Sequence, residues 1–394
     1  MRRIGILLAC LMVGAVPVAA QSLFASRGLG VPMDATDARA RVLGGLGIGL
    51  LGLDVSLVSP ATPAGTLRKG ISAVMVSSPS TMRLGDRRAF VTGTRFPLIQ
   101  AVLPVGTRWV LSAAYGGYMD QAWNVQTDRL EAIGPDTVPV HDNIKSSGGV
   151  GQYRVGLAYS LSSRLALGVS AGGYSGQQQI LLSRKFTDTT TLTEVESFQS
   201  RLARKYGAPL VSAGLRWDPV SFARLGASVT VPGKLKVTSQ KGLENRTVPL
   251  PVQVAGGASA YLSPGLLLAA SARWSGWSKA DAALTTSNTP AGVPAARDTW
   301  EIGGGLEYAS TARQTRSVPL RLGFRYAELP FSLNGQLPSE WAVGGGLGLR
   351  VGQRLDPQAL IDLGVERGTR GSTANGGLQE TFWQVSLSVS LFSR

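Results

Sequence analysis

The last strand-like stretch of the chain, residues 379–392, alternates strictly between apolar and small polar side chains. The apolar face carries Trp383, Val385, Leu387, Val389 and Leu391. The other face carries Gln384, Ser386, Ser388 and Ser390. A period of two lets one face of a strand meet lipid while the other meets a lumen, so the pattern is typical of the closing strand of a transmembrane β-barrel. A half-buried strand of a soluble sandwich has the same pattern. Only the pattern in the rest of the chain can distinguish a membrane barrel from a soluble sandwich.

The alternation recurs along the chain and predicts fourteen strands, an even number as in bacterial single-chain barrels. The predicted strands are 70–77, 94–104, 107–119, 149–161, 163–175, 208–217, 222–232, 248–262, 264–276, 298–309, 316–326, 339–350, 357–368 and 379–392. The predicted fold is therefore all-β, a fourteen-stranded antiparallel transmembrane β-barrel with an N-terminal plug segment.

The predicted connections alternate between tight and long. Tight turns are expected at 104–107, 161–164, 218–221 and 262–265, and long polar connections at 120–148, 176–207, 233–247, 277–297, 327–338 and 369–378. Up-and-down barrels of the outer membrane have short periplasmic turns and longer external loops. The alternation therefore places the chain in the cell outer membrane.

Charged residues of the predicted strands fall on the parity opposite to the apolar row. A charge on the lipid face near the midplane costs ~2–4 kcal/mol, so these side chains should point inward. They are Arg154, Arg216, Arg273, Arg321, Arg325, Glu301, Glu307, Asp362 and Glu366. Aromatic residues near strand ends suit interfacial girdles, although a soluble sandwich would bury them in its core; they are Trp109, Trp217, Trp274, Trp341 and Trp383.

Residues 1–20 resemble a secretory signal peptide, with Arg2 and Arg3 before an apolar core and Val18-Ala19-Ala20 as a cleavage site. The alternatives are a short core helix or a lipoprotein processing site at Cys10, the single cysteine. Removal of Cys10 with the leader would leave no disulfide or thiolate metal ligand. No later segment approaches the ~20 apolar residues of a membrane helix.

The formal net charge of +15 raises the question of nucleic-acid binding, but the Lys and Arg residues are scattered singly. Contact with outer-membrane lipid and lipopolysaccharide fits an exported chain better, and we expect a monomer without nucleic acid.

His141 is the single histidine and lies in a predicted polar connection. We therefore expect no enzyme, no catalytic residue, no metal and no cofactor, with a calcium site at Asp128, Glu131, Asp136 and Asp142 as the weaker alternative to a solvated loop.

Residues 21–69 contain few alternating stretches and are rich in glycine at 44–49. Small residues also crowd the inward parity of the strands, at Gly168, Ser170, Gly172, Gly303, Gly305, Gly344, Gly346 and Gly348. Glycine weakens a strand unless something approaches its backbone closely. The predicted organisation is a leader at 1–20, a plug or hatch at 21–69, and the barrel at 70–394.

Two regions resemble the long-chain fatty-acid outer-membrane transporters of the FadL type. The stretch 38–49, followed by Ser59-Pro60-Ala61, is similar to the Ala-Arg-x-x-Gly-x-Gly-Gly and Asn-Pro-Ala motifs of the hatch, with Ser59 in place of the usual Asn. Residues 321–326, 329–331 and 380–383 are similar to the C-terminal part of the family. The resemblance implies a fourteen-stranded barrel, a plug, and passage of hydrophobic molecules through a sideways opening in the wall.

The resulting hypothesis is a channel for diffusive uptake of hydrophobic small molecules such as long-chain fatty acids, gated by the plug at Ser59, Pro60 and Ala61. Bidentate arginine suits a carboxylate, so substrate could be held by Arg154, Arg216, Arg273, Arg321 and Arg325. The favoured alternative for these arginines is pairing with Glu301, Glu307, Asp362 and Glu366. The alternatives for the whole chain are a barrel scaffold or anchor in a secretion or assembly complex, or a soluble exported sandwich.

Overall fold

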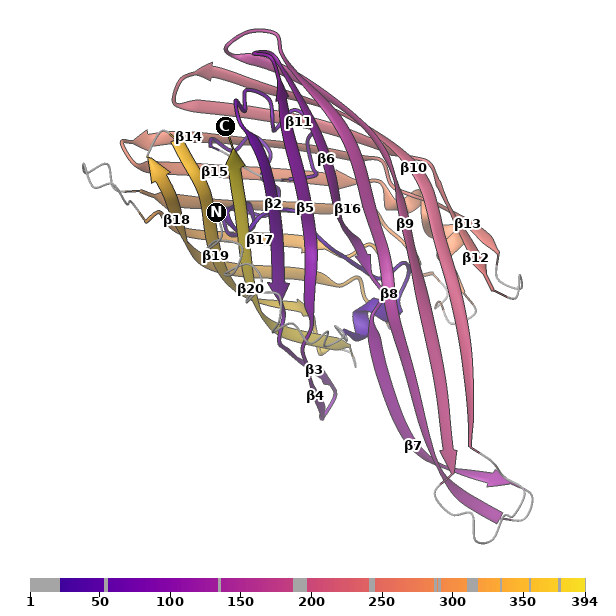
Figure 1. Cartoon of the computed structure of the whole chain (residues 1–394). Helices are drawn as coiled ribbons and strands as arrows, with labels where there is room; N and C mark the ends of the chain where they lie inside the picture. Colours follow the sequence, from indigo (N-terminus) through magenta and orange to yellow (C-terminus); the bar gives the residue numbers. More distant parts are fainter. Residues whose placement is uncertain are drawn as a thin grey trace.

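The computed structural model describes residues 22–393 except 53–55, 134–135, 187–196, 241–244, 287–288, 290–291, 310–317, 334, 354–355 and 375–376. Fourteen antiparallel strands form a closed barrel, which confirms the predicted fold (Figure 1). In ring order they are β2 (Lys69–Ser77), β5 (Thr94–Val105), β6 (Trp109–Asp120), β8 (Asp136–Ser160), β9 (Leu165–Phe186), β10 (Phe198–Val220), β11 (Ala223–Pro232), β14 (Gln253–Ser263), β15 (Leu266–Ser275), β16 (Thr299–Tyr308), β17 (Leu320–Glu328), β18 (Ser339–Gln353), β19 (Asp356–Gly371) and β20 (Leu378–Ser393). The ring closes where β20 pairs with β2, from Lys69 opposite Ser393 to Ser77 opposite Val385.

The two faces of the closing strand differ as the alternation predicts. Trp383 and Val385 are 49% and 39% exposed on the outside of the barrel, whereas Ser386 is fully buried. Inside, Ser72 of β2 donates to Ser390 of β20 across the closure, with an Oγ–Oγ distance of 2.8 Å. The apolar face is left for lipid, and the serines satisfy one another in the lumen.

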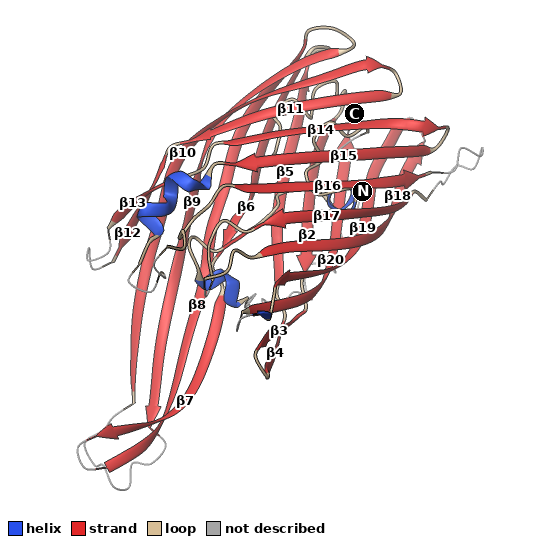
Figure 2. Ribbon diagram, turned by 180° about the vertical axis from the view of Figure 1, so that it is seen from behind, coloured by secondary structure: helices blue, strands red, loops and turns tan. Residues whose placement is uncertain are grey.

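Strands account for nearly all regular structure (Figure 2). The short helices are η1 (Leu23–Ser26), α2 (Ala38–Val42), η2 (Trp277–Ala280) and α3 (Asp281–Leu284). Within the described ranges, none of these helices is long and apolar enough to cross a membrane.

The tight turns lie together at one end of the barrel, which we take as the periplasmic end. They join β5 to β6, β8 to β9, β10 to β11 and β14 to β15. The connection from Tyr308 to Leu320 at this end is longer. At this point the alternation of tight and long connections is less regular than predicted.

The predicted boundaries are wrong at the outer end, where several strands continue far beyond the apolar segments. Much of 120–148 and 176–207, predicted as connections, forms β7 (Trp123–Ile133) and the outer parts of β8, β9 and β10. These strands project together as a blade well past the rest of the barrel (Figure 1). Smaller hairpins also extend the wall: β3 (Ser80–Leu84) with β4 (Arg87–Val91), and β12 (Lys234–Ser239) with β13 (Arg246–Pro249). Neither face of a strand outside the membrane has to meet lipid, so the alternation that marks the spanning segments is not required there.

Candidate functional site: the plugged lumen

The N-terminal segment, residues 22–68, packs inside the barrel and is called the plug segment below. It contains η1, the short strand β1 (Val31–Pro32) and α2. Helix α2 is fully buried and lies against β17, β18, β19 and β20. Its first turn is capped by Asp37, whose Oδ1 accepts from the Ala40 N–H at 2.6 Å. The proposed leader at 1–20, with Cys10, lies outside the described residues.

Glycines let the plug segment touch the barrel wall backbone to backbone. A Cβ at Gly303 would lie 2.2 Å from the carbonyl oxygen of Gly44, and one at Gly257 would lie 2.2 Å from that of Ile48. Gly44 has φ +111°, a conformation that residues with side chains rarely adopt. Not every inward glycine serves the plug: Gly172 and Gly344 are crowded by barrel atoms instead.

The predicted gate residues lie at the wall formed by β9 and β10. Ser59 is 3% exposed and Ala61 is fully buried. A Cβ at Gly168 would meet the backbone of Pro60 and Ala61 at 2.4 Å, and one at Gly214 would meet Ser59 Oγ at 2.5 Å. The three residues therefore form a tight contact between plug and wall, and their role as a gate stays a prediction.

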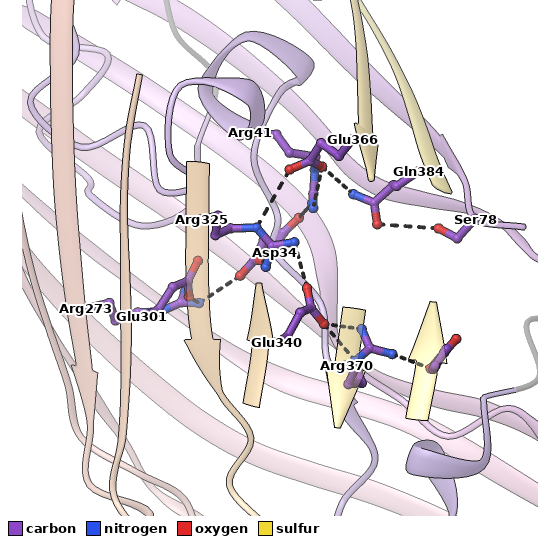
Figure 3. A network of polar contacts seen from close by, with 11 residues as sticks. Asp34, Arg41, Ser78, Arg273, Glu301, Arg325, Glu340, Glu366, Arg370 and Gln384 are labelled. Carbon is purple, nitrogen blue, oxygen red and sulfur yellow. Dashed lines mark hydrogen bonds and ion pairs between the residues drawn. The ribbon is translucent and has the colours of Figure 1, made fainter. Parts of the chain in front are cut away.

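An ion-pair network joins the plug segment to the strands around it (Figure 3). Arg273 donates to Asp34 at 2.8 Å and also contacts Glu301. Arg325 binds Glu340 at 2.7 Å and lies 3.9 Å from Asp34. This group places Asp34, a plug residue, between two arginines of β15 and β17.

The network continues toward the outer end through Arg370 of β19. Its guanidinium contacts Glu340 at 2.5 Å and Glu380 at 3.0 Å. Glu380 in turn accepts from Ser22 Oγ at 2.6 Å and from Ser80 Oγ at 2.8 Å. Ser22, at the beginning of the plug segment, is thus connected to the same ion-pair network as Asp34.

A second ionic group lies on the periplasmic side of the first. Glu307 accepts from Arg39 of α2 and from Arg321, each at 2.7 Å, and Arg321 also binds Asp362 at 2.7 Å. Two further arginines bind the plug backbone: Arg154 donates to the Leu57 carbonyl at 2.7 Å, and Arg216 donates to the Ala64 carbonyl. The inner wall therefore binds the plug segment at several levels along the barrel axis.

All five arginines predicted to bind substrate point inward and have partners in the protein. The alternative, pairing with inward carboxylates, is seen for three of them. Arg273 contacts Glu301, Arg321 binds Glu307 and Asp362, and Arg325 lies 3.8 Å from Glu366. Binding of substrate by these arginines stays a prediction. In the described state each of the five contacts at least one protein group, and Nε of Arg154, Arg216 and Arg325 has no hydrogen-bond partner.

Sequence reasoning missed the plug's own charges and several wall residues. Those missed are Asp34, Arg39, Arg41, Glu340, Arg370 and Glu380. Glu340 and Arg370 lie directly opposite one another in the β18–β19 register. Both are on the inward parity, and this signal could have identified them.

A cavity of about 110 Å³ lies within the first ionic group, bordered by plug and wall. Charged and apolar side chains share its lining, among them Asp34, Arg273, Met33, Tyr118 and Met119. Sites for drug-sized ligands occupy ~300–1,000 Å³. A long-chain ligand therefore requires movement of the plug segment or of a neighbouring strand.

The wall bends inward at the outer end of β6. The β5–β6 ladder ends at Leu98 opposite Gly116, and beyond it Met119 and Asp120 pair with Pro32 and Val31 of β1. A Cβ at Gly117 would lie 2.5 Å from Met33 Cε, so glycine permits this approach.

One ion pair crosses the resulting split between β5 and β6. Arg95 of β5, which remains paired with β2 opposite Val76, contacts Asp120 of β6. The cavity reaches both sides of the split, since Arg95 and Pro97 line it together with Tyr118 and Met119.

Three of the four acidic residues considered for calcium have partners within the blade, and the side chain of Asp136 lies outside the described part of the structure. Asp142 binds Arg184 through a two-pronged contact at 2.7 and 2.8 Å, Glu131 lies 3.2 Å from Arg184, and Asp128 contacts His141. His141 is part of strand β8, not of a loop as predicted. Arg184 is the main cause that lowers the pKa of Asp142, through its hydrogen bonds.

Solved structures show which known barrels this architecture matches. A FadL homologue from Pseudomonas aeruginosa superposes with a TM-score of 0.61 at 14% identity, covering 92% of this chain and 99% of that one. The toluene transporter TbuX from Ralstonia pickettii gives 0.58 at 14% identity over 92% and 99%. The chain has the fold of the FadL-type outer-membrane barrels. This FadL-type fold is also shared by the CymD monoaromatic hydrocarbon channel, with a TM-score of 0.55 and 16% identity over 93% and 99%.

Sequence comparison adds one match within the FadL-type barrel. Residues 220–394 match the family model named BamG. A search of curated proteins found no relative of this chain.

Proposed function

We propose that this FadL-type barrel lets hydrophobic small molecules cross the outer membrane by diffusion, leaving the lumen sideways at the bend of β6. The observation that carries the proposal is the loss of the β5–β6 ladder beyond Leu98 and Gly116, beside the cavity. A molecule leaving there enters the hydrocarbon region directly, so an apolar cargo avoids the polar periplasmic half of the lumen. The barrel works as a monomer, and the neighbours that share its fold include transporters of toluene.

The plug segment controls this route in the proposal. Met33 donates its N–H to the Tyr118 carbonyl at 2.9 Å, which joins the plug to the bent end of β6. Movement of residues 31–35 would both enlarge the cavity and release the outer end of β6 from its contacts with the plug segment. Carboxylate-bearing cargo would then meet arginines freed from Asp34, chiefly Arg273 and Arg325.

A disulfide across the split tests the route. Cells producing the Arg95→Cys/Asp120→Cys protein should take up labelled long-chain fatty acid or toluene less when oxidised, and recover after reduction. The matched control is Ala101→Cys/Ala113→Cys, because these residues face one another in the intact β5–β6 ladder. Uptake by cells with the wild-type barrel that is no greater than uptake by cells without it would sink the transport proposal for those cargoes.

The BamG match supports a second candidate, a barrel that serves as a scaffold in an assembly complex without transport. The many ion pairs that hold the plug segment suit a permanently closed barrel. Purification of the tagged protein from native outer membranes should then yield a stable protein partner, and loss of the gene should lower the amounts of other outer-membrane proteins. Recovery of the barrel alone, with those amounts unchanged, would reject this candidate.

A further inference from the structure

Three lysines form a cluster on the outer surface of the wall, at the outer edge of the lipid-facing band. They are Lys205 of β10 and Lys234 and Lys236 of β12, and all three are exposed. Lys236 lies opposite Gly207 in the β10–β12 register, and Gly207 is two positions from Lys205 on β10. Lys205 and Lys236 are therefore diagonal neighbours on the same face. Leu235 is fully buried on the inner face, so Lys234 and Lys236 on either side of it face outward.

The height of this cluster follows from strand geometry. Trp217, 46% exposed, marks the periplasmic end of the lipid-facing row on β10, and Val211 in the same row is 56% exposed. Lys205 lies ~40 Å from Trp217 along the strand at ~3.3 Å per residue, which is ~30 Å along the membrane normal at a tilt of ~40°. The apolar band of such barrels is ~25 Å tall, so Lys205 lies at the level of the outer-leaflet headgroups.

Neighbouring like charges on one face of a sheet repel each other unless a counter-charge is present. Among the described residues, none forms an ion pair with Lys205, Lys234 or Lys236. Asp142 and Glu131 bind Arg184, on the opposite face of the blade. Two more outward cations, Arg201 and Lys145, lie further out, each directly opposite Leu181.

We propose that the lysine cluster binds the phosphate groups of a phosphorylated glycolipid in the outer leaflet. Phosphate oxygens accept from ammonium groups, and the acyl chains of the same lipid would lie on the apolar row directly below, at Val211, Val229 and Val231. Basic residues at a membrane surface each add attraction to anionic headgroups. The site is independent of the lumen and of whatever the barrel carries.

Binding of defined lipids to the purified full-length barrel tests the proposal. The probes are bisphosphorylated lipid A, lipid A without phosphate, and phosphatidylethanolamine, each measured by native mass spectrometry in detergent. The wild-type protein should retain bisphosphorylated lipid A preferentially. Lys205→Ala/Lys234→Ala/Lys236→Ala should weaken that binding by on the order of tenfold to a hundredfold and leave the other two lipids unaffected.

The matched control is Lys69→Ala/Arg108→Ala/Arg164→Ala, which removes the same charge from exposed positions at the periplasmic rim. Both variants must show the heat-dependent mobility shift of a folded barrel; if the cluster triple fails, the single Lys236→Ala exchange is compared instead. Equal loss of lipid A binding in the cluster and rim variants, unchanged binding in the folded cluster variant, or equal affinity for phosphate-free lipid A would overturn the proposal.

Discussion

Arg273 of strand β15 donates to Asp34 of the plug segment across 2.8 Å. This contact joins a residue of the wall to one far earlier in the chain, and the two side chains are 17% and 11% exposed. Removing one partner of a buried ion pair typically costs ~3–5 kcal/mol, because the other charge is left without compensation.

Asp34→Asn should therefore loosen the plug segment while the barrel remains folded. Hydrogen exchange of residues 22–52 should rise in the variant, and conductance in planar bilayers should increase. Asp86→Asn, in the exposed β3–β4 turn, is the control. Exchange in residues 22–52 that equals that of the control would show that the contact does not hold the plug.

Acid should weaken the same contact. Burial tends to raise the pKa of Asp34, but Arg273, Arg325 and Arg41 outweigh it and lower the pKa from 3.8 to about 2. A lowered pKa stabilises the docked state above the ordinary pKa, and the stabilisation is lost as the pH falls through the lower value. The contribution of Asp34 to plug docking should thus be complete and independent of pH above pH ~4, and it should be lost between pH ~4 and ~2.

Conductance at stepwise lower pH checks this prediction, with Asp34→Asn as the comparison. The wild-type conductance should approach that of the variant only in the acidic window. Convergence of the two between pH 8 and 5 would contradict the assigned role of Asp34.

Gly303→Ala should displace the plug segment, because its Cβ would lie 2.2 Å from the Gly44 carbonyl oxygen. Overpacking of this kind costs ~1–3 kcal/mol. The measurement is protease cleavage of the plug in the detergent-purified barrel. Gly345→Ala is the control, since the nearest atoms to its Cβ are at 3.7 Å, and a protease pattern unchanged in both variants would argue against the close contact.

Leu322→Arg should impair insertion into membranes. Leu322 is 69% exposed on the outside of β17, and arginine on the lipid face is destabilising, by up to ~2–4 kcal/mol at the midplane and less toward the interfaces. The fraction folded into lipid vesicles, read from the gel mobility shift, should fall. Thr285→Arg, in the outer connection after α3, should fold like the wild type; normal folding of Leu322→Arg would place this face away from lipid.

The membrane-spanning strands were predictable because one face of each strand must be apolar toward lipid while the other faces the lumen, which gives the sequence a period of two. The inward positions of Arg321 and Arg325 followed from that period alone. The outer parts of β8, β9 and β10 were missed because strands outside the membrane need no apolar row facing lipid. At Gln177–Gln179 polar side chains occupy both faces, and Gln178 is buried on the inner one.

The partners within the plug could not be predicted in the same way. Asp34, Arg39 and Arg41 lie in a segment without periodicity, and their positions depend on how its glycines fit the wall. Asp37 alone carried a local signal, as a helix cap before Ala38. The arrangement of the site is therefore a consequence of long-range packing, which no short pattern encodes.

The blade has its own ladder of hydrogen bonds, and β8 pairs with both β7 and β9 there. Exchanges at its tip, near Leu130 and Pro139, need not disturb the ion pairs that hold the plug. The molecule thus separates its most projecting outer surface from the packed interior, and each is free to diversify without the other.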